Sequence, residues 1–256
     1  MLLASRFRGS SSDLLRAAGS FWRDFSTAIS PLVLETSGGL TTIGKLRLIM
    51  LLDTEAQHLR KGGYICRVRR PIDGERSEIT LKFRHPDRYV AEGRQMKSHM
   101  LVDAKFEEDI KPPFVSLYSF SATGRLRRHA PAPATLDDLT YLFPDLSKRL
   151  DSVDGRLTLA EVNGFTAREL VVTGGRLKIS AKSKAIVECA LIVWYDQQGS
   201  STEPEAVEFS YRYGNPAGRY GGKVARRAFD IFATVQSELT TWLDPNPRTK
   251  TAFVYD

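Results

Sequence analysis

The sequence predicts an α+β fold, an antiparallel eight-stranded β-barrel or tunnel with helices packed on its outside. Short runs that alternate polar and apolar residues recur along the chain, and their polar positions are mostly basic. Two long amphipathic segments are available to cover the apolar positions. No segment is biased enough to be a flexible linker, so we expect the 256 residues to form a single domain, 1–256.

The expected elements follow in order along the chain. Residues 1–9 suggest a short strand, and Ser10 to Asp13 offer capping side chains for a helix over 12–29, where apolar residues recur with helical spacing. Alternation and turn residues then predict four strands, at 46–52, 64–70, 78–84 and 105–110. The remaining elements are a helix at 135–150, strands at 176–180, 186–196 and 206–213, and a long helix at 223–243.

Residues two apart in a strand share a face, so each charge can be assigned to a side. The polar sides carry Arg67 and Arg69; Glu78, Thr80, Lys82 and Arg84; Lys105, Glu107 and Asp109; Arg176, Lys178, Ser180 and Lys182; and Glu208, Ser210 and Arg212. A sheet with one solvated face explains this pattern and is the commonest antiparallel arrangement. A closed barrel explains it too and places the charges inside, where they require partners or a ligand. The basic character of the polar sides favours the barrel.

The composition points to an anionic partner without choosing its class. The net charge is +7 and the isoelectric point is near 9.4. Cys66 and Cys189 lie in apolar runs, away from CxxC or metal-ligand spacing, and read as buried free thiols in a reducing compartment. No apolar stretch is long enough to span a membrane, so we expect a cytoplasmic protein without membrane contact.

Four segments taken in order resemble the signature of the CYTH family, also called the triphosphate tunnel metalloenzymes. They are 51–55 (LLDTE), 59–69 (LRKGGYICRVR), 78–82 (EITLK) and 105–110 (KFEEDI). In that family an Asp-Thr strand end precedes a Gly and an Arg-x-Arg strand, and an acidic strand follows a basic loop. The resemblance covers about 46–110 and is looser over 176–213.

The resemblance implies a tunnel that holds a triphosphate or polyphosphate, with Mg²⁺ or Mn²⁺ on carboxylates, in a hydrolase of the triphosphatase type. Such a site disperses the phosphate charge over fixed cations and a hard metal ion. Glu107 and Lys82 would be catalytic. The substrate would be held by Arg67, Arg69, Lys82, Arg125, Lys182 and Arg212. The metal would be held by Glu188, Glu208 and Asp109.

One departure bears on the metal. The family begins with a Glu-x-Glu-x-Lys strand, whereas Leu2, Ala4 and Arg6 occupy that register here. Loss of two carboxylates should weaken a divalent site, because hard cations gain affinity from charged oxygen ligands. Three functions therefore stay open: a triphosphatase with an altered metal site, a catalytically inactive tunnel that binds nucleotide or polyphosphate, and a basic protein that contacts nucleic acid through its outer surface.

Overall fold

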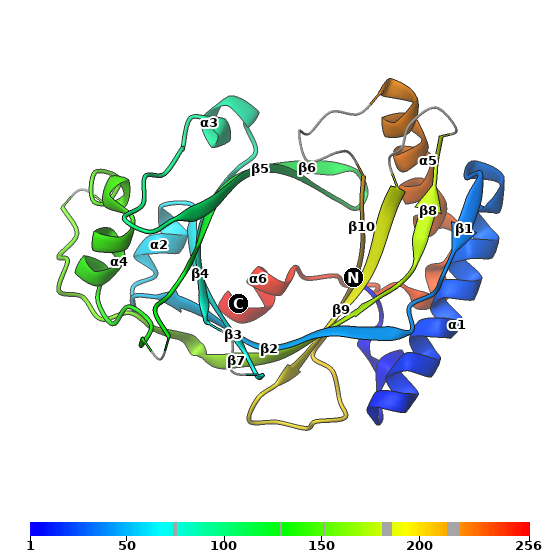
Figure 1. The fold of residues 1–256 in the computed structure, drawn as a ribbon, viewed down its shortest axis with the longest axis horizontal. Coiled ribbons are helices and arrows are strands. Elements are labelled where there is room, and N and C mark those ends of the chain that lie inside the picture. Colours follow the sequence, from blue (N-terminus) through cyan, green and yellow to red (C-terminus); the bar gives the residue numbers. More distant parts are fainter. Residues whose placement is uncertain (74–75, 129, 151, 181–185, 214–220) are drawn as a thin grey trace. The chain divides into compact units, whose positions relative to one another are not determined.

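Ten strands of the computed structural model form one antiparallel sheet (Figure 1). The structure describes residues 1–256 except 74–75, 129, 151, 181–185 and 214–220. The strands are β1 (Glu35–Ser37), β2 (Thr42–Asp53), β3 (Tyr64–Pro71), β4 (Glu78–His85), β5 (Val102–Lys111), β6 (Val115–Arg125), β7 (Ala160–Thr173), β8 (Arg176–Lys178), β9 (Ile186–Asp196) and β10 (Ala206–Arg212). Hydrogen-bonded neighbours follow the order β1, β8, β9, β7, β2, β3, β4, β6, β5, and β10 pairs with β9.

Six α-helices and four short 3₁₀ turns belong to the described residues. The helices are α1 (Ser11–Ile29), α2 (His58–Lys61), α3 (Arg88–Glu92), α4 (Leu136–Leu142), α5 (Gly222–Glu238) and α6 (Lys250–Tyr255). The 3₁₀ turns are η1 (Ala4–Phe7), η2 (Ser30–Leu32), η3 (Pro144–Leu146) and η4 (Thr240–Trp242). None of these helices combines the length and apolarity that a membrane crossing requires.

The predicted α+β class, with an antiparallel sheet and helices over apolar faces, is confirmed, but the strand count and the closure differ from the prediction. Ten strands replace the predicted eight, and for the described strands the hydrogen-bonded path ends at β1 and β5. The sheet is therefore not closed by hydrogen bonds. Charges on both sides of β5, such as Glu107 and Glu108, are typical of a protected edge strand.

The chain divides into two compact units. Unit 1 comprises 1–46 and 168–253, and unit 2 comprises 47–167 and 254–256. Strands β2 and β7 each contribute residues to both units. The single domain expected over 1–256 stays a prediction.

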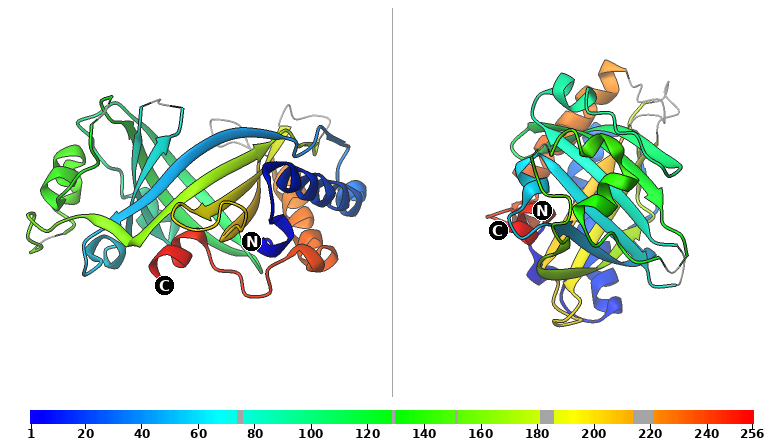
Figure 2. Two further views of the ribbon diagram at one scale, coloured as in Figure 1. Left: turned by 90° about the horizontal axis from the view of Figure 1, so that it is seen from below. Right: turned by 90° about the vertical axis from the view of Figure 1, so that its left-hand side faces the viewer.

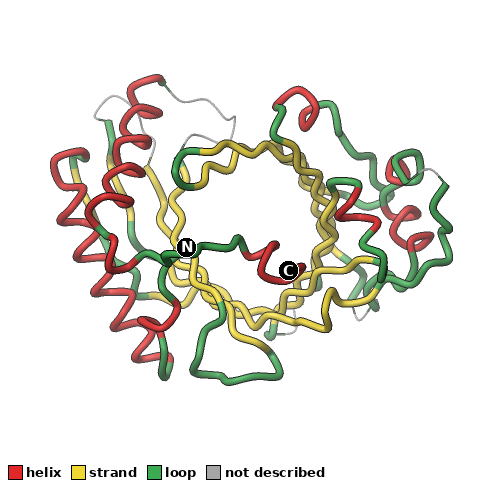
Figure 3. The backbone as a smooth tube through the Cα atoms, turned by 180° about the vertical axis from the view of Figure 1, so that it is seen from behind, coloured by secondary structure: helices red, strands yellow, loops and turns green. Residues whose placement is uncertain are grey.

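In unit 1, helices α1 and α5 lie side by side against the apolar face of β8, β9 and β10 (Figures 1 and 3). Helix α1 begins at a capping box, in which Ser10 Oγ accepts from the Asp13 backbone N–H and Asp13 accepts from the Ser10 backbone N–H. Its apolar stripe, with Phe21 and Phe25, packs on Phe209 of β10 with ring centroids 4.8 Å apart in both pairs. Burial of this stripe holds the helix on the sheet.

In unit 2, helix α4 lies across the strands and covers their apolar face (Figure 2, right). The core between them is built from Val68 of β3, Leu81 of β4, and Leu139 and Phe143 at α4. A capping box of Thr135 and Asp138 starts α4. Cys66 lies in this core and Cys189 in that of unit 1, and both are free and buried, which confirms their prediction as buried thiols.

The Asp53 carboxylate anchors the end of β2 in unit 2. Its oxygens accept from the backbone N–H groups of Thr54, Leu59 and Arg60 and from the Tyr255 hydroxyl. The Asp-Thr pair within 51–55 therefore has a structural role, because a buried carboxylate needs several donors.

Several expected elements need correction. The suggested strand at 1–9 is wrong: Leu2 makes isolated bridges to Val207 and Leu243, and η1 follows because its turn buries Phe7 in the unit 1 core. The helix expected at 135–150 ends at Leu142, since Pro144 lacks a backbone N–H and begins η3 instead. Strands β6 and β7 were not predicted, and Arg125, predicted as a substrate-binding residue, ends β6.

Candidate anion-binding site

One face of the unit 2 sheet carries most of the predicted site residues, and we call it the basic face. Its polar residues are Arg67, Arg69, Glu78, Thr80, Lys82, Arg84, Asp103, Lys105, Glu107, Asp109, Ser119, Ser121, Thr123 and Arg125. These residues alternate with the apolar residues that pack under α4. The polar faces predicted for the strands at 64–70, 78–84 and 105–110 are thus observed on β3, β4 and β5.

Strand register arranges the basic face in rows. Arg69, Glu78 and Arg125 lie opposite one another across β3, β4 and β6. The Arg69 Nη1 and Glu78 Oε2 atoms are 3.9 Å apart. The next row begins with Arg67 and continues with Thr80 and Thr123, whose hydroxyl oxygens are 2.9 Å apart. Cations from separate strands are therefore held in fixed order by the backbone pairing.

Lys82 occupies the centre of the basic face. Its Nζ lies 3.4 Å from Asp109 Oδ2 and 3.8 Å from Glu107 Oε2, and the side chain is 14% exposed. Burial lowers the pKa of Lys82 below its ordinary value, Asp109 and Glu107 act in the opposite direction, and the cations Arg84 and Arg67 lower this pKa further. The ammonium charge is thus only partly compensated.

Arg84 also belongs to this cluster although it was not among the predicted site residues. Its Nη2 lies 3.9 Å from Asp109 Oδ2, two positions along β4 from Lys82. Strand alternation had placed Arg84 beside Lys82, so the signal was present in the sequence. Neutral donors line the centre as well, since Ser119 and Ser121 are buried and the Ser119 Oγ has no hydrogen-bond partner among the described residues.

Unit 1 carries the other predicted residues on the sheet face opposite its core. Glu188 of β9 lies in register with Arg176 of β8 and with Arg212 of β10. Glu208 of β10 forms an ion pair with Lys250, with Nζ and Oε1 3.1 Å apart. The prediction for Lys182 falls on 181–185, outside the described residues. Lys250 was not predicted, and helix α6, which begins at this residue, is too short at 6 residues to give a clear periodic signal.

The predicted metal ligands do not assemble a cation site within either unit. Asp109 belongs to unit 2, whereas Glu188 and Glu208 belong to unit 1. Across the described ranges, no three His, Cys, Asp or Glu side chains are grouped so that they could hold a metal ion. Asp109 and Glu208 each have a lysine ammonium within 3.4 Å. This donor set does not fit Mg²⁺ or Mn²⁺, which favour several charged oxygens around one point.

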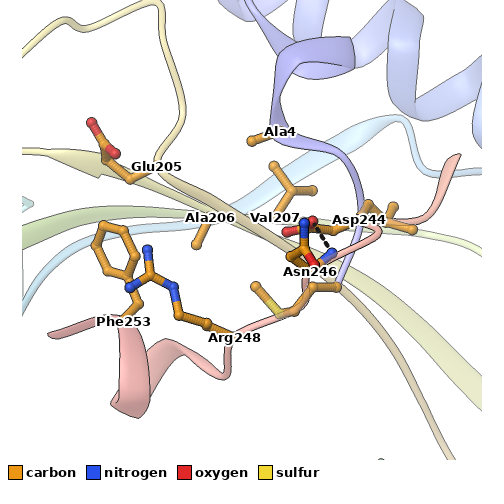
Figure 4. A pocket seen from close by; sticks show the side chains of 10 residues that line it. Ala4, Glu205, Ala206, Val207, Asp244, Asn246, Arg248 and Phe253 are labelled. Carbon is orange, nitrogen blue, oxygen red and sulfur yellow. Dashed lines mark hydrogen bonds between the residues drawn. The ribbon is translucent and has the colours of Figure 1, made fainter. Parts of the chain in front are cut away.

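The pocket drawn in Figure 4 lies in unit 1, its described lining includes none of the predicted site residues, and it has a volume of about 240 Å³. Glu205, Asp244, Asn246 and Arg248 supply its polar groups. The Arg248 guanidinium stands 5.7 Å from the Phe253 ring centroid, and the Asn246 backbone N–H donates to Asp244. Because carboxylates and a guanidinium are mixed there, the pocket lacks the cationic excess of the basic face.

No family model matches the chain, and no curated protein matches it. Among solved structures it is similar to a putative adenylyl cyclase from Hippeastrum, described as having a dominant triphosphatase activity. The two are 13% identical with a TM-score of 0.44, and the match covers 97% of this chain and 91% of the other.

Proposed function

We propose that the basic face of unit 2 binds a polyphosphate or an organic triphosphate, as a divergent relative of the triphosphate tunnel proteins that segment 46–110 resembles. The partly compensated ammonium of Lys82 carries this proposal. It is flanked by Arg67 and Arg84, which lower its pKa. A polyanion in contact with these cations would favour the charged form of Lys82 and gain charge-assisted hydrogen bonds.

The rows of the face suit an extended anion better than a single phosphate. Arg69 and Arg67 follow each other on β3, and Lys82 and Arg84 do so on β4. Residues two apart on a strand are about 7 Å apart, so the two cations of each strand are spread along an extended anion and do not converge on one phosphate group. The hydroxyls of Thr80 and Thr123 supply neutral polar contacts between them.

Calorimetric titration of the full chain with tripolyphosphate and with ATP tests the proposal. We expect saturable binding, and we expect Arg67→Ala combined with Lys82→Ala to weaken it by at least about tenfold, or 1.4 kcal/mol. Arg156→Met is the matched control, because Arg156 also lies in unit 2 but its side chain is 87% exposed beside Asp154. Equal affinities for the double variant and the control would refute the proposal.

Hydrolysis is the second candidate function. Glu107 lies within 3.8 Å of Lys82, so a carboxylate next to the bound anion could orient a water molecule. Release of phosphate from any ligand that binds, with Mg²⁺ or Mn²⁺ supplied and with Glu107→Gln as the inactive comparison, would support a triphosphatase. Binding without release would support a catalytically inactive polyphosphate-binding protein.

Nucleic-acid contact on the outer surface makes a different prediction. Its affinity would fall steeply with salt and would survive Arg67→Ala combined with Lys82→Ala, because phosphate contacts elsewhere would be unaffected. Filter binding of the same variants to single-stranded and double-stranded oligonucleotides separates this alternative from the basic face.

A further inference from the structure

We infer that the basic face binds its polyanion without a divalent metal ion, because the Lys82 ammonium lies beside Glu107 and Asp109, the carboxylates of this face that such an ion would need. This inference rests on the proposed function and departs from the metal dependence that the resemblance to the tunnel enzymes implies. The ion pairs of Lys82 lead to it, and in unit 1 the predicted ligand Glu208 is paired with a lysine as well.

Lys82 pairs with two carboxylates of the basic face. Its Nζ lies within 4 Å of carboxylate oxygens of both Glu107 and Asp109. A divalent ion held by these two carboxylates, at metal–oxygen distances of about 2.0–2.6 Å, would lie next to the ammonium and be repelled by it. The ammonium and the Arg84 guanidinium, 3.9 Å from Asp109, together offset the two charges of this acidic pair, and the ammonium still has N–H groups to donate to phosphate oxygens.

Lys250 provides the pairing in unit 1. Its Nζ lies 3.1 Å from Glu208 Oε1, its side chain is 18% exposed, and it stands 5.4 Å from the Trp194 ring centroid. The Trp194 indole N–H donates to the buried Glu169 carboxylate at 2.7 Å, which fixes the ring. Lys250 is thus held by a carboxylate and an aromatic face, and both interactions favour its charge.

Glu188, the remaining predicted ligand, is in register with Arg176 and Arg212. Each carboxylate expected to bind a metal therefore has a cationic side chain of this protein paired with it or opposite it on a neighbouring strand. A hard cation gains affinity from uncompensated charged oxygens, and these three carboxylates do not supply them within one unit. Arginine and lysine side chains therefore supply the positive charge at the anion site.

Titration of the full chain with tripolyphosphate in EDTA and in Mn²⁺ tests the inference. We expect dissociation constants that agree within about threefold, which corresponds to less than 0.7 kcal/mol. Binding that disappears in EDTA and returns with Mn²⁺ would overturn the inference while leaving the proposed function intact. Absence of binding in both conditions would instead refute the proposed function, so the two failures are distinguishable.

A substitution at Lys82 supplies a second test. Lys82→Met removes the ammonium between Glu107 and Asp109, so tripolyphosphate affinity should fall in EDTA and recover partly with Mn²⁺, which can then use the two carboxylates. The triple variant Lys82→Met, Glu107→Gln, Asp109→Asn should show no recovery. Lys82→Arg should behave like the unmodified protein. If Mn²⁺ tightens binding to the unmodified protein more than to Lys82→Met, the inference fails.

Discussion

The Tyr255 hydroxyl donates a hydrogen bond to the Asp53 carboxylate, with 3.0 Å between the oxygens, and joins 254–256 to the end of β2 within unit 2. Two further contacts fix this segment, since Asn163 Nδ2 donates to the Val254 carbonyl and the Arg60 guanidinium stands 4.5 Å from the Tyr255 ring centroid. Burial raises the pKa of Tyr255, and the Asp53 charge and hydrogen bond raise it further, so the phenol stays a donor at neutral pH.

Tyr255→Phe should destabilise the protein by about 1–3 kcal/mol, because the buried Asp53 carboxylate loses one donor while the ring remains in place. Chemical denaturation measures the change. Tyr141→Phe is the matched control, since Tyr141 is 70% exposed and its loss of a hydroxyl should leave the unfolding free energy unchanged. Equal stability of the two variants would show that the Asp53 contact contributes nothing.

Lys82→Met should keep or raise the melting temperature while it weakens polyanion binding. Burial disfavours the Lys82 charge, so its removal relieves a cost in the folded state even though two ion pairs are lost. Differential scanning calorimetry without ligand gives the stability. A clear loss of melting temperature would mean that the ion pairs, and not the anion site, explain why a lysine is present.

Asp109→Asn should strengthen tripolyphosphate binding at neutral pH and low salt, by roughly threefold, because one negative charge leaves the basic face. Added salt should reduce the difference by screening. A metal-ligand role for Asp109 predicts the opposite sign, namely weaker binding in the variant when Mn²⁺ is present. Isothermal titration with and without Mn²⁺ therefore distinguishes the two roles.

Lys250→Met should cost about 1 kcal/mol or less of stability by leaving the partly buried Glu208 without its cation. Combining it with Glu208→Gln should restore most of that loss, because the charge that needs the partner is then absent. A double-mutant cycle by urea denaturation gives the coupling. A coupling near zero would show that the two side chains do not interact in solution.

The thiols predict a loss of stability at alkaline pH. Burial raises the pKa of Cys66 and of Cys189 from 9.0 to about 12, and Asp53 adds to the shift at Cys66. A raised folded-state pKa contributes stability that is complete below pH 9.0 and is lost as pH rises toward 12. Between pH 9.0 and about 12, the unfolding free energy should fall less steeply for Cys66→Ala combined with Cys189→Ala than for the unmodified protein. Equal slopes for the two proteins would show that the thiols do not cause the loss of stability.

The strand faces and the first helix are determined by the sequence by itself. A period of two places Arg67, Lys82 and Glu107 on polar sides without knowledge of any partner strand, because successive side chains in a strand point in opposite directions. Likewise, Ser10 and Asp13 mark the start of α1 through local hydrogen bonds alone. Strand β6 was missed although Tyr118, Phe120 and Ala122 alternate with Ser119, Ser121 and Thr123, and in the structure it pairs with both β4 and β5.

Only the tertiary structure decided which charges meet. The alternation assigns Lys82 and Asp109 to polar sides, but the pairing of β4 with β6 and of β6 with β5 brings them to 3.4 Å. Lys250, at the start of α6, reaches Glu208 across 42 positions of sequence, and Tyr255 reaches Asp53 across 202. Local periodicity reports the direction of a side chain, whereas its partner depends on long-range register and burial, which no short segment contains.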